Sequence, residues 1–225
     1  MRAIRLTIAV TAVLMAAPAF AQDWMEFTSR MDRFTVNVPG QPKVQEIMWP
    51  SEYGATFPGR VYIVEQGTSR YSMTVIDYTE AERIHAERPK TEAEAGGGGV
   101  YWQVDVQASI AYAATKFRQR PGVKVTYDAY HYIDLVSGHQ LQLTNPDQSR
   151  TFVGIYLHEN RLYILEATVP ARMPAPGLFQ QSLGFLDEAG NHVRYREIYF
   201  NKLPPARLGR GGRGGGRAGG GGQQP

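Results

Sequence analysis

One stretch of the chain decides its fold class: residues 161–169 read RLYILEATV. Side chains alternate between the two faces of an extended strand, so Leu162 and Ile164 share one face. The opposite face carries four more apolar side chains, those of Tyr163, Leu165, Ala167 and Val169. Apolar side chains on both faces are typical of a strand in the middle of a sheet that is covered on both sides. The stretch therefore predicts a central, doubly covered strand.

The segments around this stretch predict further strands. They are rich in Val, Ile, Tyr and Thr, and short runs of turn residues separate them, such as Gly67-Thr68-Ser69, Ser137-Gly138 and Glu159-Asn160. Such short connections join antiparallel neighbours. The expected strands span residues 33–38, 44–49, 60–66, 70–78, 123–135, 139–144, 151–158 and 161–169, with an amphipathic edge strand over 192–200.

Helices are expected between and after the strands. Five apolar residues recur at steps of three and four, as they do on one face of a helix: Trp102, Val106, Ile110, Ala113 and Phe117. Pro121-Gly122 ends that helix. Residues 81–95 favour a helix or a charged connector, and residues 174–186 favour a short helix. The order of elements predicts an α+β fold, in which helices pack against one antiparallel sheet.

Residues 1–21 have the layout of a cleavable signal peptide. Arg2 and Arg5 precede an apolar run over residues 6–17, and Ala19 and Ala21 form the small-residue pattern that a signal peptidase reads. A run of about 12 residues is shorter than the roughly 20 that span a bilayer, and no second such run follows. We therefore expect a periplasmic or secreted protein without a transmembrane segment in its mature part.

The rest of the chain divides into a folded part and a tail. Residues 22–203 are long enough for a single α+β domain with a sizeable core, whereas residues 204–225 consist almost wholly of Gly, Arg, Ala, Gln and Pro. Too few apolar residues are present in this second segment to offset the entropy of ordering. We therefore expect a disordered Gly/Arg-rich tail.

The positive charge of the chain is concentrated at its two ends. The formal net charge is +3 at pH 7, yet the signal contributes two arginines and the tail contributes four, so the segment between them carries −3. This distribution disfavours nucleic-acid binding by the folded part. The tail arginines are candidates for contact with an anionic envelope surface: they are Arg207, Arg210, Arg213 and Arg217.

Residues that could carry catalysis or bind a metal are scattered along the chain. Cysteine is absent, which excludes disulfides, thiolate metal sites and a cysteine nucleophile. Ser137 lacks the Gly-x-Ser-x-Gly context of a hydrolase nucleophile. The histidines form no metal-binding pair at helical spacing, although the second and third can face one another across a hairpin: these are His85, His131, His139, His158 and His192.

A tyrosine-rich strand offers one further candidate surface. Asp128 and Asp134 flank this strand, and paired carboxylates can act as acid and base. Its tyrosines, Tyr127, Tyr130 and Tyr132, could also form an aromatic binding face. Strand tyrosines usually pack the ring and expose the hydroxyl, so an ordinary sheet surface is favoured. We assign no catalytic, cofactor-binding or metal-binding residue and expect no cofactor.

Two parts of the sequence resemble the PsbP-like α/β sandwich family of exported proteins. Residues 33–42 read RFTVNVPGQP, a strand that ends in Pro-Gly-x-Pro, and residues 161–165 are followed by Pro170 and then by FQQSL at 179–183. The resemblance implies a sandwich and a non-enzymatic binding or assembly-support role for an unknown protein or envelope partner. A hydrolase-type enzyme with a non-standard site, or envelope association through the basic tail, is the alternative.

Overall fold

The structure, a computed structural model, describes residues 24–89 and 100–201. The expected signal peptide with Ala19 and Ala21, the glycine run 96–99 and the tail with its four arginines lie outside these residues. Among residues 24–89 and 100–201, none of the helices has the length and hydropathy of a membrane span.

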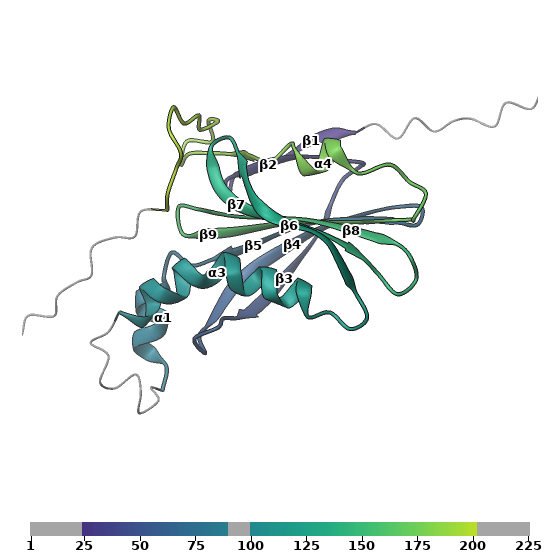
Figure 1. Ribbon diagram of the computed structural model, residues 1–225. Coiled ribbons are helices and arrows are strands. Elements are labelled where there is room, and N and C mark those ends of the chain that lie inside the picture. Colours follow the sequence, from purple (N-terminus) through teal and green to yellow (C-terminus); the bar gives the residue numbers. More distant parts are fainter. Residues whose placement is uncertain (1–23, 90–99, 202–225) are drawn as a thin grey trace, which may run out of the picture.

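Two antiparallel sheets make up most of the described chain (Figure 1). The larger has seven strands in the order β3-β4-β5-β9-β8-β7-β6, and the smaller has three in the order β1-β2-β10. The strands are β1 (Met25–Ser29), β2 (Phe34–Val38), β3 (Lys43–Pro50), β4 (Thr56–Gln66), β5 (Ser69–Asp77), β6 (Lys124–Ile133), β7 (Val136–Thr144), β8 (Arg150–His158), β9 (Arg161–Val169) and β10 (Gly184–Phe185). The helices are α1 (Ala81–Glu87), α3 (Tyr101–Arg118) and α4 (Gly177–Gln180). The predicted α+β fold with antiparallel strands is confirmed.

Strand β9 lies in the middle of the larger sheet, as its sequence predicts. It pairs with β5 on one side and with β8 on the other. Tyr163 and Leu165 pack into one apolar cluster, whereas Leu162 and Ile164 pack into a second cluster. Figure 1 shows β1, β2 and α4 on one side of the larger sheet, and α1 and α3 on the other side. Each face of the central strand is therefore covered.

Helix α3 covers the second face with the predicted apolar stripe. Trp102, Val106, Ala113 and Phe117 are buried in one cluster with Leu141, Val153 and Ile155 of the sheet. Full burial of a large apolar side chain contributes roughly 1.5–3 kcal/mol relative to exposure. The stripe therefore holds the helix against the sheet.

The smaller sheet corrects the expectation of a single sheet. Residues 25–29 form β1, where no strand is expected, and the helix expected over 174–186 is limited to α4. Residues Gly184 and Phe185 instead pair with β2 as β10. A Cβ atom at Gly184 would lie 2.7 Å from Thr35 Oγ1, so the absence of a side chain allows this close pairing.

The hairpin of β6 and β7 turns earlier than the sequence suggests. Asp134 and Leu135 form the turn, both with positive φ, at 46° and 62°. Ser137 and Gly138 lie inside β7, so their interpretation as turn residues is wrong. A Cβ atom at Gly138 would collide with the Tyr156 ring and with a backbone oxygen of β8. The glycine is therefore needed for packing between strands, not for the turn.

The edge strand expected over residues 192–200 is also wrong. This part of the chain makes only the isolated bridges Leu186↔His192 and Val136↔Tyr199. We call residues 192–201 the C-terminal strap, because the Tyr199 amide donates to the Leu135 carbonyl and the Val193 amide donates to the Phe185 carbonyl. The strap is fastened by its aromatic side chains and these few bonds, not by a ladder.

We predict that Gly138→Ala lowers the free energy of unfolding by about 2–3 kcal/mol, because the new methyl group must displace backbone or the Tyr156 ring. Gly177→Ala is the matched control, since a Cβ atom at Gly177 meets nothing within 4 Å. Urea unfolding of both variants measures the difference. Equal stabilities would contradict the packing role of Gly138.

Candidate functional site

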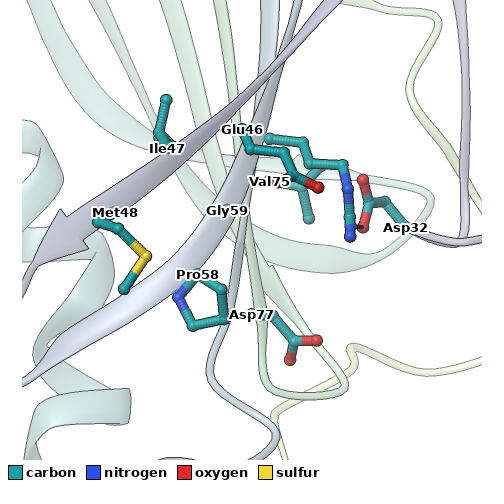
Figure 2. A pocket seen from close by; sticks show the side chains of 9 residues that line it. Asp32, Glu46, Ile47, Met48, Pro58, Gly59, Val75 and Asp77 are labelled. Carbon is teal, nitrogen blue, oxygen red and sulfur yellow. Dashed lines mark hydrogen bonds and ion pairs between the residues drawn. The ribbon is translucent and has the colours of Figure 1, made fainter.

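A groove of about 300 Å³ opens beside the edge strand β3 (Figure 2). It lies on the face of the larger sheet that the smaller sheet covers, because Glu46 pairs with Arg60, and Arg60 pairs with Val75 of the first apolar cluster. Its lining combines apolar and charged side chains: Asp32, Glu46, Ile47, Met48, Pro58, Gly59, Arg60, Val75 and Asp77. We call it the β3 groove.

Gly59 allows close packing of β4 against β5 at the groove. A Cβ atom at this position would lie 2.7 Å from the Val75 carbonyl oxygen and 3.3 Å from Ile47. Any side chain at Gly59 would therefore push β4 away from β5. Strand β3 is terminal in its sheet, so its outer backbone groups have no strand neighbour among the described residues.

The charged groups of the groove differ in how they are engaged. Asp32 accepts from Arg60 Nη1 at 2.7 Å, which neutralises both side chains. Asp77 is half-buried, and its Oδ1 accepts from the Thr79 amide at 2.9 Å and from the Thr79 hydroxyl at 2.6 Å, which leaves Oδ2 for a ligand. Glu46 is exposed, and its carboxylate has no ion-pair partner within residues 24–89 and 100–201. Two carboxylates beside an apolar wall suit a cationic group on an aliphatic stem.

Asp32 also fastens the smaller sheet to the larger one. Its second oxygen accepts from the Tyr62 hydroxyl at 2.5 Å, and its backbone carbonyl accepts from the Tyr163 hydroxyl at 2.9 Å. Burial, and then the hydrogen bond to Asp32, raises the pKa of Tyr62, so the phenol keeps its proton and donates it. The Ser29 hydroxyl joins this network at 2.9 Å from Tyr62.

A second buried cluster joins α1, α3 and the end of β3. Ser51 Oγ donates to Asp105 Oδ2 at 2.5 Å, and His85 Nε2 contacts the same oxygen at 2.8 Å. Arg88 donates to His85 Nδ1 at 3.2 Å, and because a guanidinium only donates, the imidazole proton lies on Nε2. In a serine hydrolase the imidazole contacts the nucleophile, whereas here the aspartate stands between them. The cluster therefore has the geometry of a structural link between α1, α3 and the end of β3.

The tyrosine-rich strand is β6, at the other edge of the larger sheet. Asp128 binds Arg118 at 2.7 Å and His139 at 2.5 Å, and the arginine above all lowers the pKa of Asp128 to about 2. Asp134 binds Arg194 at the hairpin turn, so the structure does not bring the two aspartates together. Tyr130 is 85% exposed and Tyr127 and Tyr132 are about half exposed.

His131 and His139, which could have faced one another across the hairpin, do not do so. The turn at Asp134–Leu135 places His131 opposite Gly138, and it places His139 opposite Tyr130. Neighbouring positions of a strand point to opposite faces, so the two imidazoles lie on different faces of the hairpin. His131 contacts the Tyr156 hydroxyl at 2.9 Å. Among the described residues, no group of three His, Asp or Glu side chains could hold a metal ion.

His158 lies under the C-terminal strap. Its ring stacks on Phe185 at 4.4 Å, and its Nε2 contacts the Tyr195 hydroxyl at 2.7 Å. Burial, and then the charges of Arg161 and Arg33, lowers the pKa of His158 to about 4. The remaining histidine, His192, is exposed at 3.9 Å from Glu26.

Sequence reasoning missed the Asp32 and Asp105 networks and the β3 groove. Asp105 stands next to Val106 and three positions after Trp102, so it lies on the apolar side of a predicted helix. A carboxylate in such a stripe indicates a buried partner. No comparable pattern marks Asp32, because its partners Tyr62 and Tyr163 are distant in sequence.

Comparison with known proteins finds similarity only at the level of structure. No protein-family model matches the chain, and no curated protein matches its sequence. Among solved structures, the chain is similar to the solution structure of cyanobacterial PsbP (CyanoP) from Synechocystis sp. PCC 6803. The TM-score is 0.37 and the sequence identity is 8%, over 68% of this chain and 84% of that chain.

We predict that acid destabilises the fold through His158. Its pKa lies below the ordinary 6.5, so the unfolded chain takes up the proton first, and stability present above pH 6.5 is lost as pH falls toward about 4. The loss from this group is roughly 3 kcal/mol. Urea unfolding at several pH values should show a shallower pH dependence for His158→Gln than for the exposed control His192→Gln. Identical slopes would contradict this assignment.

Proposed function

We propose that this chain is an exported binding or assembly-support domain without catalytic activity, built as a PsbP-like sandwich and acting in the periplasm or outside the cell. The resemblance of residues 33–42 and 161–183 to that family supports the sandwich. The signal-like pattern that ends at Ala21 supports export. The partner is a protein or envelope component that presents an extended basic segment to the β3 groove.

The free carboxylate of Glu46 beside an unpaired strand edge is the observation that carries this proposal. An extended segment can add to a sheet edge through backbone hydrogen bonds, while pockets for its side chains give specificity. Along β3 the outer edge offers those backbone groups, and Glu46, Asp77 and the exposed Met48 offer a cation-binding pocket next to them. Edge and pocket together therefore suit a basic extended partner.

The hydrolase alternative receives less support from the contacts of the site. Its nearest candidate is Ser51, which is buried and held by Asp105 and by the Ala55 amide. A nucleophile has to reach a substrate and to contact its base. Both requirements conflict with the contacts of Ser51, so binding is the favoured class.

Association with an anionic envelope surface is a second candidate, favoured by the charge of the tail. Four arginines and Lys202 lie within residues 202–225, which contain no acidic residue. Each exposed arginine near an anionic surface gains about 1 kcal/mol at best. This activity would belong to the tail alone and would weaken steeply with salt.

We predict that residues 22–225, used as bait, capture a component of their own envelope fraction, and that Glu46→Lys reduces this capture about tenfold by repelling a basic partner. Glu65→Lys is the matched control, since Glu65 is exposed on β4 but its position faces away from the groove. Quantitative mass spectrometry of the captured proteins measures the ratio.

A chain that ends at Leu203 separates the two candidates. If both lengths capture the component and Glu46→Lys weakens that capture, the result supports binding at the groove. Capture only by the tailed chain at low salt supports the tail instead. Equal capture by the Glu46 and Glu65 variants would contradict a binding role for the β3 groove.

A further inference from the structure

The described chain ends beside the β3 groove. Asn201 exchanges two hydrogen bonds with Asn160, at 2.8 and 2.6 Å. The carbonyl of Asn160 accepts from the Tyr78 amide at 2.8 Å, and Tyr78 directly follows the groove residue Asp77. The tail therefore departs from the end of β5, next to one carboxylate of the groove.

The first tail arginines can reach the whole groove. Arg207 is six residues beyond Asn201, a stretch that extends to about 20 Å. From Asp77 on β5 to Met48 on β3 the groove crosses two strand spacings, which is about 10 Å. The reach of the chain thus exceeds the span of the groove, and Arg210 reaches further still.

Charge and surface chemistry match between the tail and the groove. The tail is uniformly basic, whereas the groove exposes Glu46 and Asp77. Arg60 is the basic residue that lines the groove, and Asp32 neutralises it. Arg161 lies opposite Asp77 in the register. Met48 is 65% exposed on the groove wall, a surface on which the aliphatic stem of an arginine can pack.

We infer that the tail folds back onto the β3 groove, with the guanidinium of Arg207 or Arg210 between Glu46 and Asp77 and its stem against Met48. The groove is then occupied by the chain itself, and a basic partner has to displace the tail. This inference rests on the proposed function, because it concerns the same groove and describes how partner binding there is regulated.

The test uses a spin label on the full mature chain. Because the sequence contains no cysteine, Leu208→Cys gives one labelling site between the two arginines. Paramagnetic broadening of amide resonances then reports where the label resides. We expect the strongest broadening at Glu46, Ile47, Met48 and Asp77, at least threefold relief in 0.5 M NaCl, and similar relief in Glu46→Gln.

Glu65→Gln is the control, because it removes the same charge outside the groove and should leave the broadening unchanged. Broadening that spreads evenly around Asn201 and does not change with salt would overturn the inference, as would broadening centred on helix α1. A docked tail without any captured partner would contradict only the proposed function. Capture that depends on Glu46 without a docked tail would contradict only the inference.

Discussion

The larger sheet buries apolar side chains on both faces of β9 and β8, and this double burial requires a cover on each side. One cover is α3, whose apolar stripe faces the sheet. The other is the small sheet of β1, β2 and β10, which brings Phe34 and Phe185 against Tyr163. The β3 groove depends on the second cover, because Asp32 of the β1–β2 connection lines it and holds Arg60.

Apolar contact alone leaves each cover free to slide, and two buried aspartates fix their positions. Asp32 links the β1–β2 connection to Tyr62 and Tyr163, and Asp105 links α3 to Ser51 and His85. Removing one partner of such a network leaves buried polar atoms unsatisfied, at a cost of about 1–3 kcal/mol each. The Asp32 network also reaches the groove, since Asp32 holds Arg60, which lies opposite Glu46 in the register.

The fold class, the central strand and the long helix could be predicted because each leaves a local pattern, such as the two apolar faces of residues 161–169. The small sheet could not, since β10 has two residues and gains its partner only when distant Thr35 and Phe34 approach. The turn at Ser137-Gly138 was wrongly predicted, because the sequence does not distinguish a glycine that makes room for a neighbouring ring from a glycine in a turn. The groove could not be predicted for a similar reason: Asp32, Glu46 and Asp77 are far apart in sequence. They meet only when β3, β4 and β5 pair and the β1–β2 connection packs against them.

Binding at a sheet edge is compatible with this architecture, because the rigid, doubly covered centre supports exposed strands at either end. Both covers together hold β9 in the folded state. Native-state amide hydrogen exchange tests it most directly. If both covers hold β9, the amides of Leu162–Val169 open only with global unfolding, within about 1 kcal/mol of its free energy, while β3 and β6 amides exchange from smaller openings. Exchange of β9 as fast as that of the edge strands would contradict the double cover.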